Sequence, residues 1–286
     1  MNNKNLNRLI QQALAIESEE AKEAGALGYM ARALVQASMP HSRPEGLVFE
    51  RTNGAFSLVM MGHPHAGLPY GTVPRLLLAW LTTEAVRTRE RELVLGDTLS
   101  RFMAQLDLIP TGGRWGTITR LRDQMRRLFA STVSCTYDAP GTWALETVTI
   151  ADRARLWWDP KQPAQAALWA SSVTLSDRFF HEVTDRPIPI DLRALKALKR
   201  SPMALDLYTW LTYRMSYLER LTEIPWGALQ LQFGADYPYT PQGTADFKRK
   251  ALGALKKVLA VYPKLRASDG PRGLRLLPSP SHVRGA

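Results

Sequence analysis

The 286-residue sequence predicts an α+β protein in which two domains of one architecture follow an N-terminal helical extension. Two observations predict this class. Segments with apolar residues at helical spacing alternate with short β-rich segments that end in glycine or proline turns. The tripeptide Trp-Leu-Thr also occurs twice, at residues 80–82 and 210–212, and similar elements follow it each time. The expected boundaries are residues 1–40, 41–170 and 171–286.

The N-terminal extension is expected to be helical over residues 1–39, because apolar side chains recur there mostly at helical spacing. Gly25 and Gly28 are expected to bend or break this helix. After a short connector, residues 48–62 predict a hairpin, since two β-rich runs flank the turn-forming pair Asn53-Gly54.

The first repeated unit is expected to run in the order helix, strand, helix, turn, helix, hairpin. Pro74 is tolerated in the first turn of its first helix, and Asp97 is expected to cap its second helix. This is the order of a winged helix, in which a helix-turn-helix enters the major groove of DNA and a hairpin flanks it. The elements are expected at residues 73–88, 92–96, 97–108, 110–113, 117–130 and 131–150.

The second unit is expected to have the same order of elements. Residues 150–191 are interpreted as a connector with one strand and a short helix, and Trp157 and Trp158 are expected to pack as a pair at the junction. The elements of the second unit are expected at residues 202–221, 223–234, 238–243, 244–263 and 264–279.

An offset of 130 residues aligns the two units. The apolar and basic positions of the helix before each hairpin coincide, and a glycine precedes each of these helices. A chance repeat of one tripeptide would not extend over a whole domain, so the tryptophan is expected to fill the core behind the helix-turn-helix in both units. The matching pairs include Trp80 with Trp210, Gly113 with Gly243 and Arg126 with Lys256.

Charge and composition narrow the class of partner. The net charge is +11 and the isoelectric point is about 9.9, which favours nucleic acid first and an anionic membrane surface second. No stretch approaches the roughly 18 apolar residues of a membrane span, and no secretory signal is evident. The lone cysteine, Cys135, excludes an internal disulfide and is expected to be a half-buried strand residue. A cytoplasmic protein without membrane contact is expected.

The helix expected from Thr117 is the first candidate for reading DNA. Its apolar residues form one stripe, and threonines stand at the N-terminal end, where a recognition helix meets base edges. Arginine can bind guanine through two parallel hydrogen bonds, and glutamine can bind adenine in the same way. The candidates in this helix and its lead-in are Arg114, Thr117, Thr119, Arg120, Arg122, Gln124, Arg126 and Arg127.

The helix expected from Thr244 is the second candidate. It is richer in lysine, a flexible point charge suited to phosphate, so arginine content alone favours the first helix as the base reader. Arg272 and Arg275 in the C-terminal hairpin could reach a minor groove, and Lys196, Lys199 and Arg200 could touch phosphate. A solvated basic face is the alternative interpretation of each cluster. The remaining candidates are Thr240, Gln242, Thr244, Lys248, Arg249, Lys250 and Lys256.

An enzyme interpretation rests on His63 and His65 in the sequence GHPHAG. Two histidines separated by one residue on a strand could hold a divalent metal, as in nickases of the rolling-circle type, with Tyr213 or Tyr217 as the nucleophile. Pro64, the flanking glycines and the lack of an acidic partner favour turn histidines instead. No phosphate-binding glycine loop and no zinc-type spacing occurs. The sequence thus predicts no enzyme, and no catalytic residue, metal or cofactor is expected.

Five segments resemble the plasmid-encoded replication initiator family, RepA. The resemblance runs from about Pro40 to Tyr262 and leaves the first 39 residues outside. Its blocks are long, which makes it more specific than a short catalytic motif. They are PHSRPEGLVFER, LPYGTVPRLLLAWLTTEAVRT, LVLGDTLSRFMAQLDLIPTGGRWGTITRLRDQMRRLFAS, PIDLRALKALKRSPMALDLYTWLTYRMSYL and TPQGTADFKRKALGALKKV.

The resemblance implies a bacterial initiator that binds directly repeated double-stranded DNA sites, iterons, at a plasmid origin. Such initiators prepare origin opening and recruit the host replication initiator and helicase. Many exchange between an active monomer and a homodimer that represses its own promoter, which controls plasmid copy number. The N-terminal helix could mediate that dimer.

The same analogy assigns different roles to the two domains. It assigns base reading to the second winged helix, and phosphate contacts and dimerisation to the first, which is the opposite of the arginine-based interpretation. Both basic helices therefore remain candidates. A winged-helix transcriptional regulator that binds one palindrome as a dimer is the non-enzymatic alternative.

Overall fold

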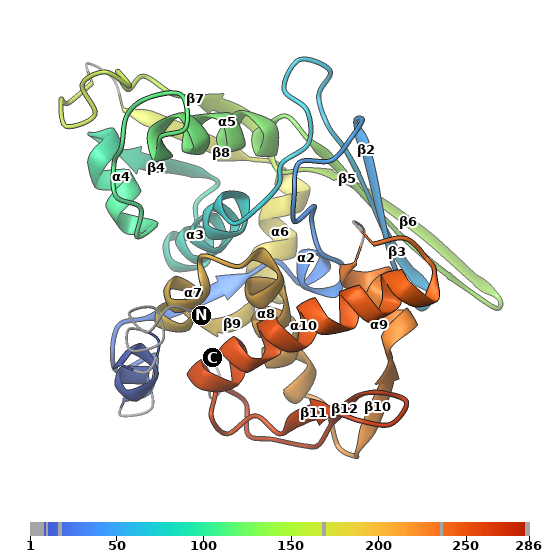
Figure 1. The fold of residues 1–286 in the computed structure, drawn as a ribbon. Helices are drawn as coiled ribbons and strands as arrows, with labels where there is room; N and C mark the ends of the chain where they lie inside the picture. Colours follow the sequence, from blue (N-terminus) through green and yellow to red (C-terminus); the bar gives the residue numbers. More distant parts are fainter. Residues whose placement is uncertain (1–8, 10, 17–18, 168–169, 235–236, 284–286) are drawn as a thin grey trace.

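The computed structural model describes residues 9, 11–16, 19–167, 170–234 and 237–283. In this part of the chain the protein is a mixed α/β molecule with four small antiparallel sheets. Helices form the body of the molecule, and a long four-stranded sheet extends away from it on one side (Figure 1). No helix in the described ranges is long and apolar enough to cross a lipid bilayer.

The N-terminal segment is not one helix, so the prediction for residues 1–39 is wrong where β1 (Leu27–Met30) forms. β1 pairs antiparallel with β9 (Ile188–Asp191), and Gly28 lies opposite Ile190. Gly28 is required by this packing, because a Cβ there would lie 2.4 Å from the side chain of Leu192. A short helix, α2 (Arg32–Gln36), follows β1. Residues 1–8, 10 and 17–18 of the expected extension lie outside the described residues.

The first unit begins with the elements that the sequence predicts. They are α3 (Val73–Thr88), β4 (Glu92–Gly96), α4 (Leu99–Gln105) and α5 (Thr117–Phe129). The expected cap of α4 is wrong by one residue. Thr98 is the N-cap, and its hydroxyl accepts the backbone N–H of Arg101 at 3.2 Å, whereas the carboxylate of Asp97 lies 3.6 Å from the guanidinium of Arg101.

The hairpin after α5 forms at the predicted residues but belongs to another sheet. β5 (Thr132–Ala139) and β6 (Thr142–Thr149) extend the predicted hairpin of β2 (Val48–Asn53) and β3 (Phe56–Met61) into the order β2-β3-β5-β6. β3 carries fully buried Leu58 and Met60 on its inner face, and these lie opposite Cys135 and Val133 of β5. β4 pairs with β8 (Ser171–Leu175), which pairs on its other side with β7 (Ala151–Arg155), in the order β4-β8-β7.

The second unit repeats the helix order and the strand pairing of the first, but its last two strands follow the third helix directly, whereas β5 and β6 intervene in the first unit. β9 and α7 (Leu192–Leu198) lead into it after α6 (Asp177–Asp185). Its sheet has the order β10-β12-β11, so the strand after the first helix pairs with the last strand, as in β4-β8-β7. The elements are α8 (Pro202–Met215), β10 (Thr222–Pro225), α9 (Trp226–Phe233), α10 (Pro241–Val261), β11 (Ala267–Asp269) and β12 (Gly273–Leu276).

The repeated tryptophan holds the second helix of each unit. Trp80 of α3 packs edge-on against Phe102 of α4, with ring centroids 5.1 Å apart. Trp210 of α8 packs edge-on against Phe233 of α9, at 5.4 Å. The ring of Trp158 stacks on that of Phe102, with centroids 5.3 Å apart, while Trp157 is 49% exposed. Only one of the two adjacent tryptophans therefore packs into the core.

A buried ion pair joins the two units. Arg75 of α3, only 2% exposed, donates from Nε and Nη2 to the two carboxylate oxygens of Asp206 on α8, at 2.6 and 2.7 Å. Its guanidinium also donates to the backbone carbonyls of Met39, Pro40 and Gly71. Although burial alone would raise the pKa of Asp206, the charge of Arg75 and a hydrogen bond from His41 hold it below the ordinary value.

His41 completes this cluster. Its Nε2 lies 2.6 Å from the second carboxylate oxygen of Asp206. Burial lowers the pKa of His41, so the ring is neutral near pH 7 and donates its Nε2–H to the carboxylate. The segment that precedes β2 is thus fixed against both α3 and α8.

Candidate nucleic-acid interface

A tight turn sets the start of α5. The hydroxyl of Thr111 accepts the backbone N–H of Thr117, and the hydroxyl of Thr117 accepts the backbone N–H of Thr111, both at 2.9 Å. Gly116 closes the turn, because a Cβ there would lie 2.2 Å from the carbonyl oxygen of Thr111. The turn therefore fixes where the N-terminal end of α5 is presented to solvent.

The outer face of α5 is basic. Thr119, Arg120, Arg122 and Arg126 are exposed, while the apolar stripe of the helix is buried. None of the ion pairs in the described residues involves these three arginines. Arg114 in the lead-in turn is also exposed and lies over the ring of Trp115, which is 80% exposed. A guanidinium without a carboxylate partner is free to bind an anion.

Other predicted residues of α5 have structural partners. Gln124 is 4% exposed, and its side-chain oxygen accepts the backbone N–H of Tyr70 at 2.8 Å. Arg127 pairs with Asp123 at 2.8 Å and donates to the carbonyl of Leu68 at 3.3 Å. The structure thus turns Gln124 and Arg127 toward the segment before α3, and they do not join the exposed arginines.

The start of α10 is also built by polar side chains that the sequence assigns to DNA. Thr240 is the N-cap, and its hydroxyl accepts the backbone N–H of Gly243 at 3.1 Å. The hydroxyl of Thr244 donates to the side-chain oxygen of Gln230 on α9 at 2.6 Å. Gln242 remains exposed in the first turn. The helix begins at Pro241, three residues before the predicted start.

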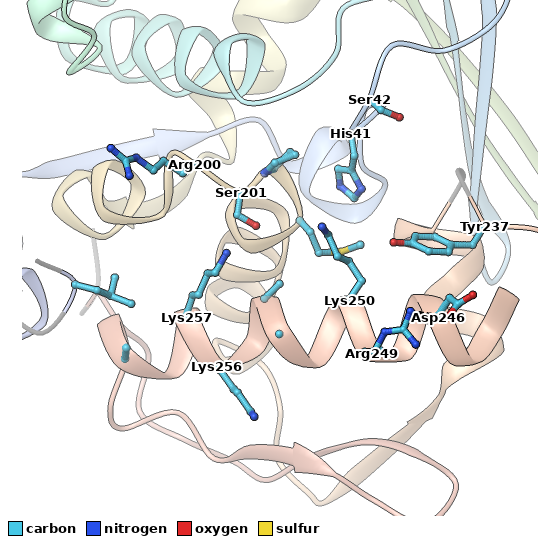
Figure 2. A pocket seen from close by; sticks show the side chains of 16 residues that line it. His41, Ser42, Arg200, Ser201, Tyr237, Asp246, Arg249, Lys250, Lys256 and Lys257 are labelled. Atoms are coloured by element: carbon cyan, nitrogen blue, oxygen red, sulfur yellow. Dashed lines mark ion pairs between the residues drawn. The ribbon is translucent and has the colours of Figure 1, made fainter. Parts of the chain in front are cut away.

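A basic groove runs along α10 (Figure 2). Its volume is about 1150 Å³, and Lys250 and Lys257 rise from α10 toward Ser201 at the start of α8. The opposite wall includes Arg200 and His41. The lining cations are Arg200, Arg249, Lys250, Lys256 and Lys257.

The charges in this groove are mostly positive. Asp246 is the carboxylate among the described residues that line it, and it lies 2.7 Å from the guanidinium of Arg249. Lys250 and Lys256 are exposed and take part in none of the ion pairs in the described ranges. A hollow lined in this way attracts polyanions.

Two predicted residues brace the C-terminal hairpin instead. Lys248 lies 2.8 Å from the carboxylate of Asp269 and over the ring of Trp226. The backbone N–H of Arg272 donates to Glu223 at 2.7 Å, and this bond is the main reason that the pKa of Glu223 lies below its ordinary value. Arg275 is exposed on β12.

Arg200 lies in the basic groove, whereas the neighbouring Lys199 donates to Asp107 at 2.5 Å. The sequence carries a signal for this difference. Ser201 and Pro202 form a helix start, with the hydroxyl of Ser201 accepting the backbone N–H of Ala204, and Arg200 directly before them lines the groove.

The histidine motif lies outside the named strands, and not on a strand as the enzyme interpretation supposes. His63 and His65 lie in a turn whose backbone bridges His63 to Gly67. In the described part of the chain, no group of three or more His, Cys, Asp or Glu side chains is placed to hold a metal ion. Tyr213 and Tyr217 pack against each other at the end of α8, with ring centroids 5.1 Å apart, and neither lines the hollow beside the histidines.

Two repeated units that each present a basic helix define a candidate DNA-binding protein. α5 and α10 lie well apart in the molecule (Figure 1). Each basic helix is the third helix of its unit, and a two-stranded hairpin follows it.

The model of the family described as plasmid encoded RepA protein matches residues 68–225, which is more than half of the chain. The chain belongs to this family of plasmid replication initiators, and the resemblance seen in the sequence is confirmed. No curated protein matches the chain.

Two crystal structures of domains 2 and 3 of RctB share the fold. One, of selenomethionine derivatives, is 10% identical, covers 88% of this chain and 99% of its own, and has a TM-score of 0.55. The other is 10% identical, covers 85% and 94%, and has a TM-score of 0.50. At this identity the likeness concerns the fold.

Proposed function

We propose that the protein initiates plasmid replication by binding direct repeats, or iterons, in the duplex DNA of the origin through two winged helices. The observation that carries this proposal is the recurrence of an exposed basic helix at the same position in both units. The repeated strand orders β4-β8-β7 and β10-β12-β11 support the winged-helix assignment, since each basic helix precedes the hairpin that completes its sheet. Family membership supports the role in replication.

The two basic helices have distinct tasks in this proposal. Arg122 of α5 and Arg249 of α10 contact bases, because a guanidinium can form a fork with guanine. Lys250 and Lys256 contact phosphates as point charges. Arg249 then exchanges its partner Asp246 for DNA, which costs little because its side chain is 78% exposed.

The fixed docking of the units sets the spacing of these contacts. The ion pair between Arg75 and Asp206 joins α3 to α8 and so holds the two units together. The basic helices α5 and α10 therefore meet one repeat at a defined separation. Two such contacts on a straight duplex favour bending, which costs on the order of 1–6 kcal/mol and is offset by the added contacts. The bend prepares opening of an AT-rich region, to which the host replication initiator and helicase are then recruited. No covalent chemistry is involved.

A homodimer that represses the initiator's own promoter is the second part of the proposal. β6 is an edge strand, and Trp143 and Leu145 on it are 66% and 50% exposed. An unprotected edge with apolar side chains favours pairing with another strand. We place the dimer contact at β6 rather than on the N-terminal helix.

Footprinting on the plasmid that carries the gene tests the proposal. Protection of several direct repeats at the origin is the expected result, and protection of one isolated palindrome would favour the transcriptional regulator. Incubation of supercoiled origin DNA with the protein and Mn²⁺ is expected to leave it intact. A nick with a covalent tyrosine adduct would overturn the non-enzymatic mechanism.

A further inference from the structure

A second hollow lies beside the basic face of α5 and includes the histidine turn. We call it the His-Arg hollow. It has a volume of about 510 Å³ and is lined by His63, His65, Ala66, Arg122, Arg126, Phe129, Ala130, Ala154 and Leu156. Its polar side chains are two imidazoles and two guanidinium groups, and no carboxylate is among the described residues that line it. Such a lining selects an anion.

The turn gives one imidazole a defined orientation. The backbone N–H of His65 donates to Nδ1 of His63 at 3.2 Å. A nitrogen that accepts a hydrogen bond carries no proton, so the neutral ring of His63 carries its proton on Nε2. That N–H is free to donate to a ligand, and both histidines are exposed.

Arg127 fixes the turn relative to α5. Its guanidinium donates to the carbonyl of Leu68, directly after the turn, and is held in place by Asp123. Gly67 has a φ of 81°, and a Cβ there would lie 2.6 Å from Nη1 of Arg127. The positive φ favours glycine at this position, and the contacts of Arg127 with the turn keep the imidazoles beside the exposed arginines.

We infer that the His-Arg hollow holds one phosphodiester group of the DNA backbone next to the bases that α5 contacts. This inference rests on the proposed function. The imidazoles and the guanidinium of Arg126 donate to the phosphate oxygens, while Arg122 reaches the neighbouring base, and Phe129 and Leu156 contact the adjoining deoxyribose. A single phosphate would leave most of the hollow empty, whereas a backbone nucleotide fills more of it. The turn thus gives the first unit a contact that flanks its basic helix.

Neutralisation of single phosphates tests this inference. A duplex with one origin repeat is prepared with a methylphosphonate at each backbone position in turn, and its affinity is measured by fluorescence anisotropy for wild type and for His63→Ala/His65→Ala. Hydrogen bonds to charged groups predict that one position costs the wild type about tenfold in affinity and costs the double variant much less. Equal losses for both proteins at every position would overturn the inference.

Two further variants control the measurement. Gly67→Ala displaces the turn without removing a histidine and is expected to abolish the same selective loss. His181→Ala removes an exposed histidine of α6 and is expected to retain the selective loss of affinity at that one phosphate. If Gly67→Ala keeps the loss, or His181→Ala abolishes it, the phosphate is not held by the turn. Unfolding curves confirm that each variant is folded.

Two outcomes separate this inference from the proposed function. If Arg126→Ala weakens repeat binding and the double histidine variant does not, only the inference fails. If Arg126→Ala also leaves binding unchanged, the proposed role of α5 fails as well. A titration with inorganic phosphate in the absence of DNA tests whether the His-Arg hollow binds a free anion. The expected result is no saturable shift of the ring resonances of His63 and His65, and such a shift would overturn the assignment to DNA.

Discussion

Replacement of Asp206 by asparagine tests how the two units are held together. The carboxylate accepts hydrogen bonds from Arg75 at 2.6 and 2.7 Å and from Nε2 of His41 at 2.6 Å. Asparagine keeps the volume but removes the charge, so the buried guanidinium of Arg75 keeps only carbonyl groups as full acceptors. Removal of one partner from a buried ion pair costs about 3–5 kcal/mol.

Urea unfolding at neutral pH, followed by tryptophan fluorescence, measures this cost. The matched control is Asp97→Asn, because Asp97 forms an exposed pair with Arg101 at 3.6 Å. Exposed pairs contribute about 0–1 kcal/mol, so the control is expected to change the free energy of unfolding little. For a chain of this size, the loss expected for Asp206→Asn corresponds to a fall in Tm of about 10 °C.

A loss for Asp206→Asn no larger than that of the control would refute this reasoning. The double variant Arg75→Met/Asp206→Leu removes both charges at similar volume. It is expected to recover much of the stability, since apolar residues often replace a buried pair without loss. If the double variant is less stable than Asp206→Asn, the cost arises from packing and not from the unpaired charge.

Four further predictions concern DNA binding, assembly, pH and reactivity. Arg122→Ala and Arg249→Ala are each expected to weaken repeat binding by about 1–3 kcal/mol, and equal losses on unrelated DNA would show phosphate contacts only. Leu145→Lys is expected to shift dimer to monomer in light scattering, and an unchanged mass would place the dimer elsewhere. Burial lowers the pKa of His282, as it does for His41, so the unfolded chain binds these protons more readily. Their contribution to stability is present above about pH 6.5 and is lost as the pH falls through the folded-state values. The Tm is expected to fall on acidification, and to fall less in His282→Gln. Burial raises the pKa of the Cys135 thiol to about 12, so alkylation at mildly alkaline pH is expected to be much slower in the folded than in the unfolded protein.

Local patterns predict most helices and hairpins of this chain. α3 and β4 have the expected bounds, because an apolar helix with proline in its first turn and a short β-rich run are specified by neighbouring residues. The residues of a hairpin do not show which other strand the hairpin pairs with. β5 and β6 join β3 because the buried faces match, and the hairpin that completes the sheet of β4 lies further along the chain. β1 escapes prediction for the same reason, since its partner β9 is more than 150 residues away.

The exposed arginines of α5 were predictable from the apolar stripe. The burial of Gln124 was not, because its partner is the backbone N–H of Tyr70, which is distant in sequence. The ion pair between the units had a signal that sequence reasoning missed. Arg75 is the lone charge between Val73 and Thr83, and Asp206 is the lone charge between Pro202 and Tyr213. A single charge in an apolar helix needs a buried partner, and the two helices carry opposite signs.

The salt dependence of binding to a duplex with one origin repeat tests most directly whether both basic helices hold the same DNA. Two variants are compared with the wild type, one with Arg120 and Arg126 changed to glutamine, and the other with Lys250 and Lys256 changed to glutamine. Each set removes up to two phosphate contacts, so each is expected to lower the slope of log affinity against log salt by about 2. A slope that changes for only one of the two sets would contradict a shared interface.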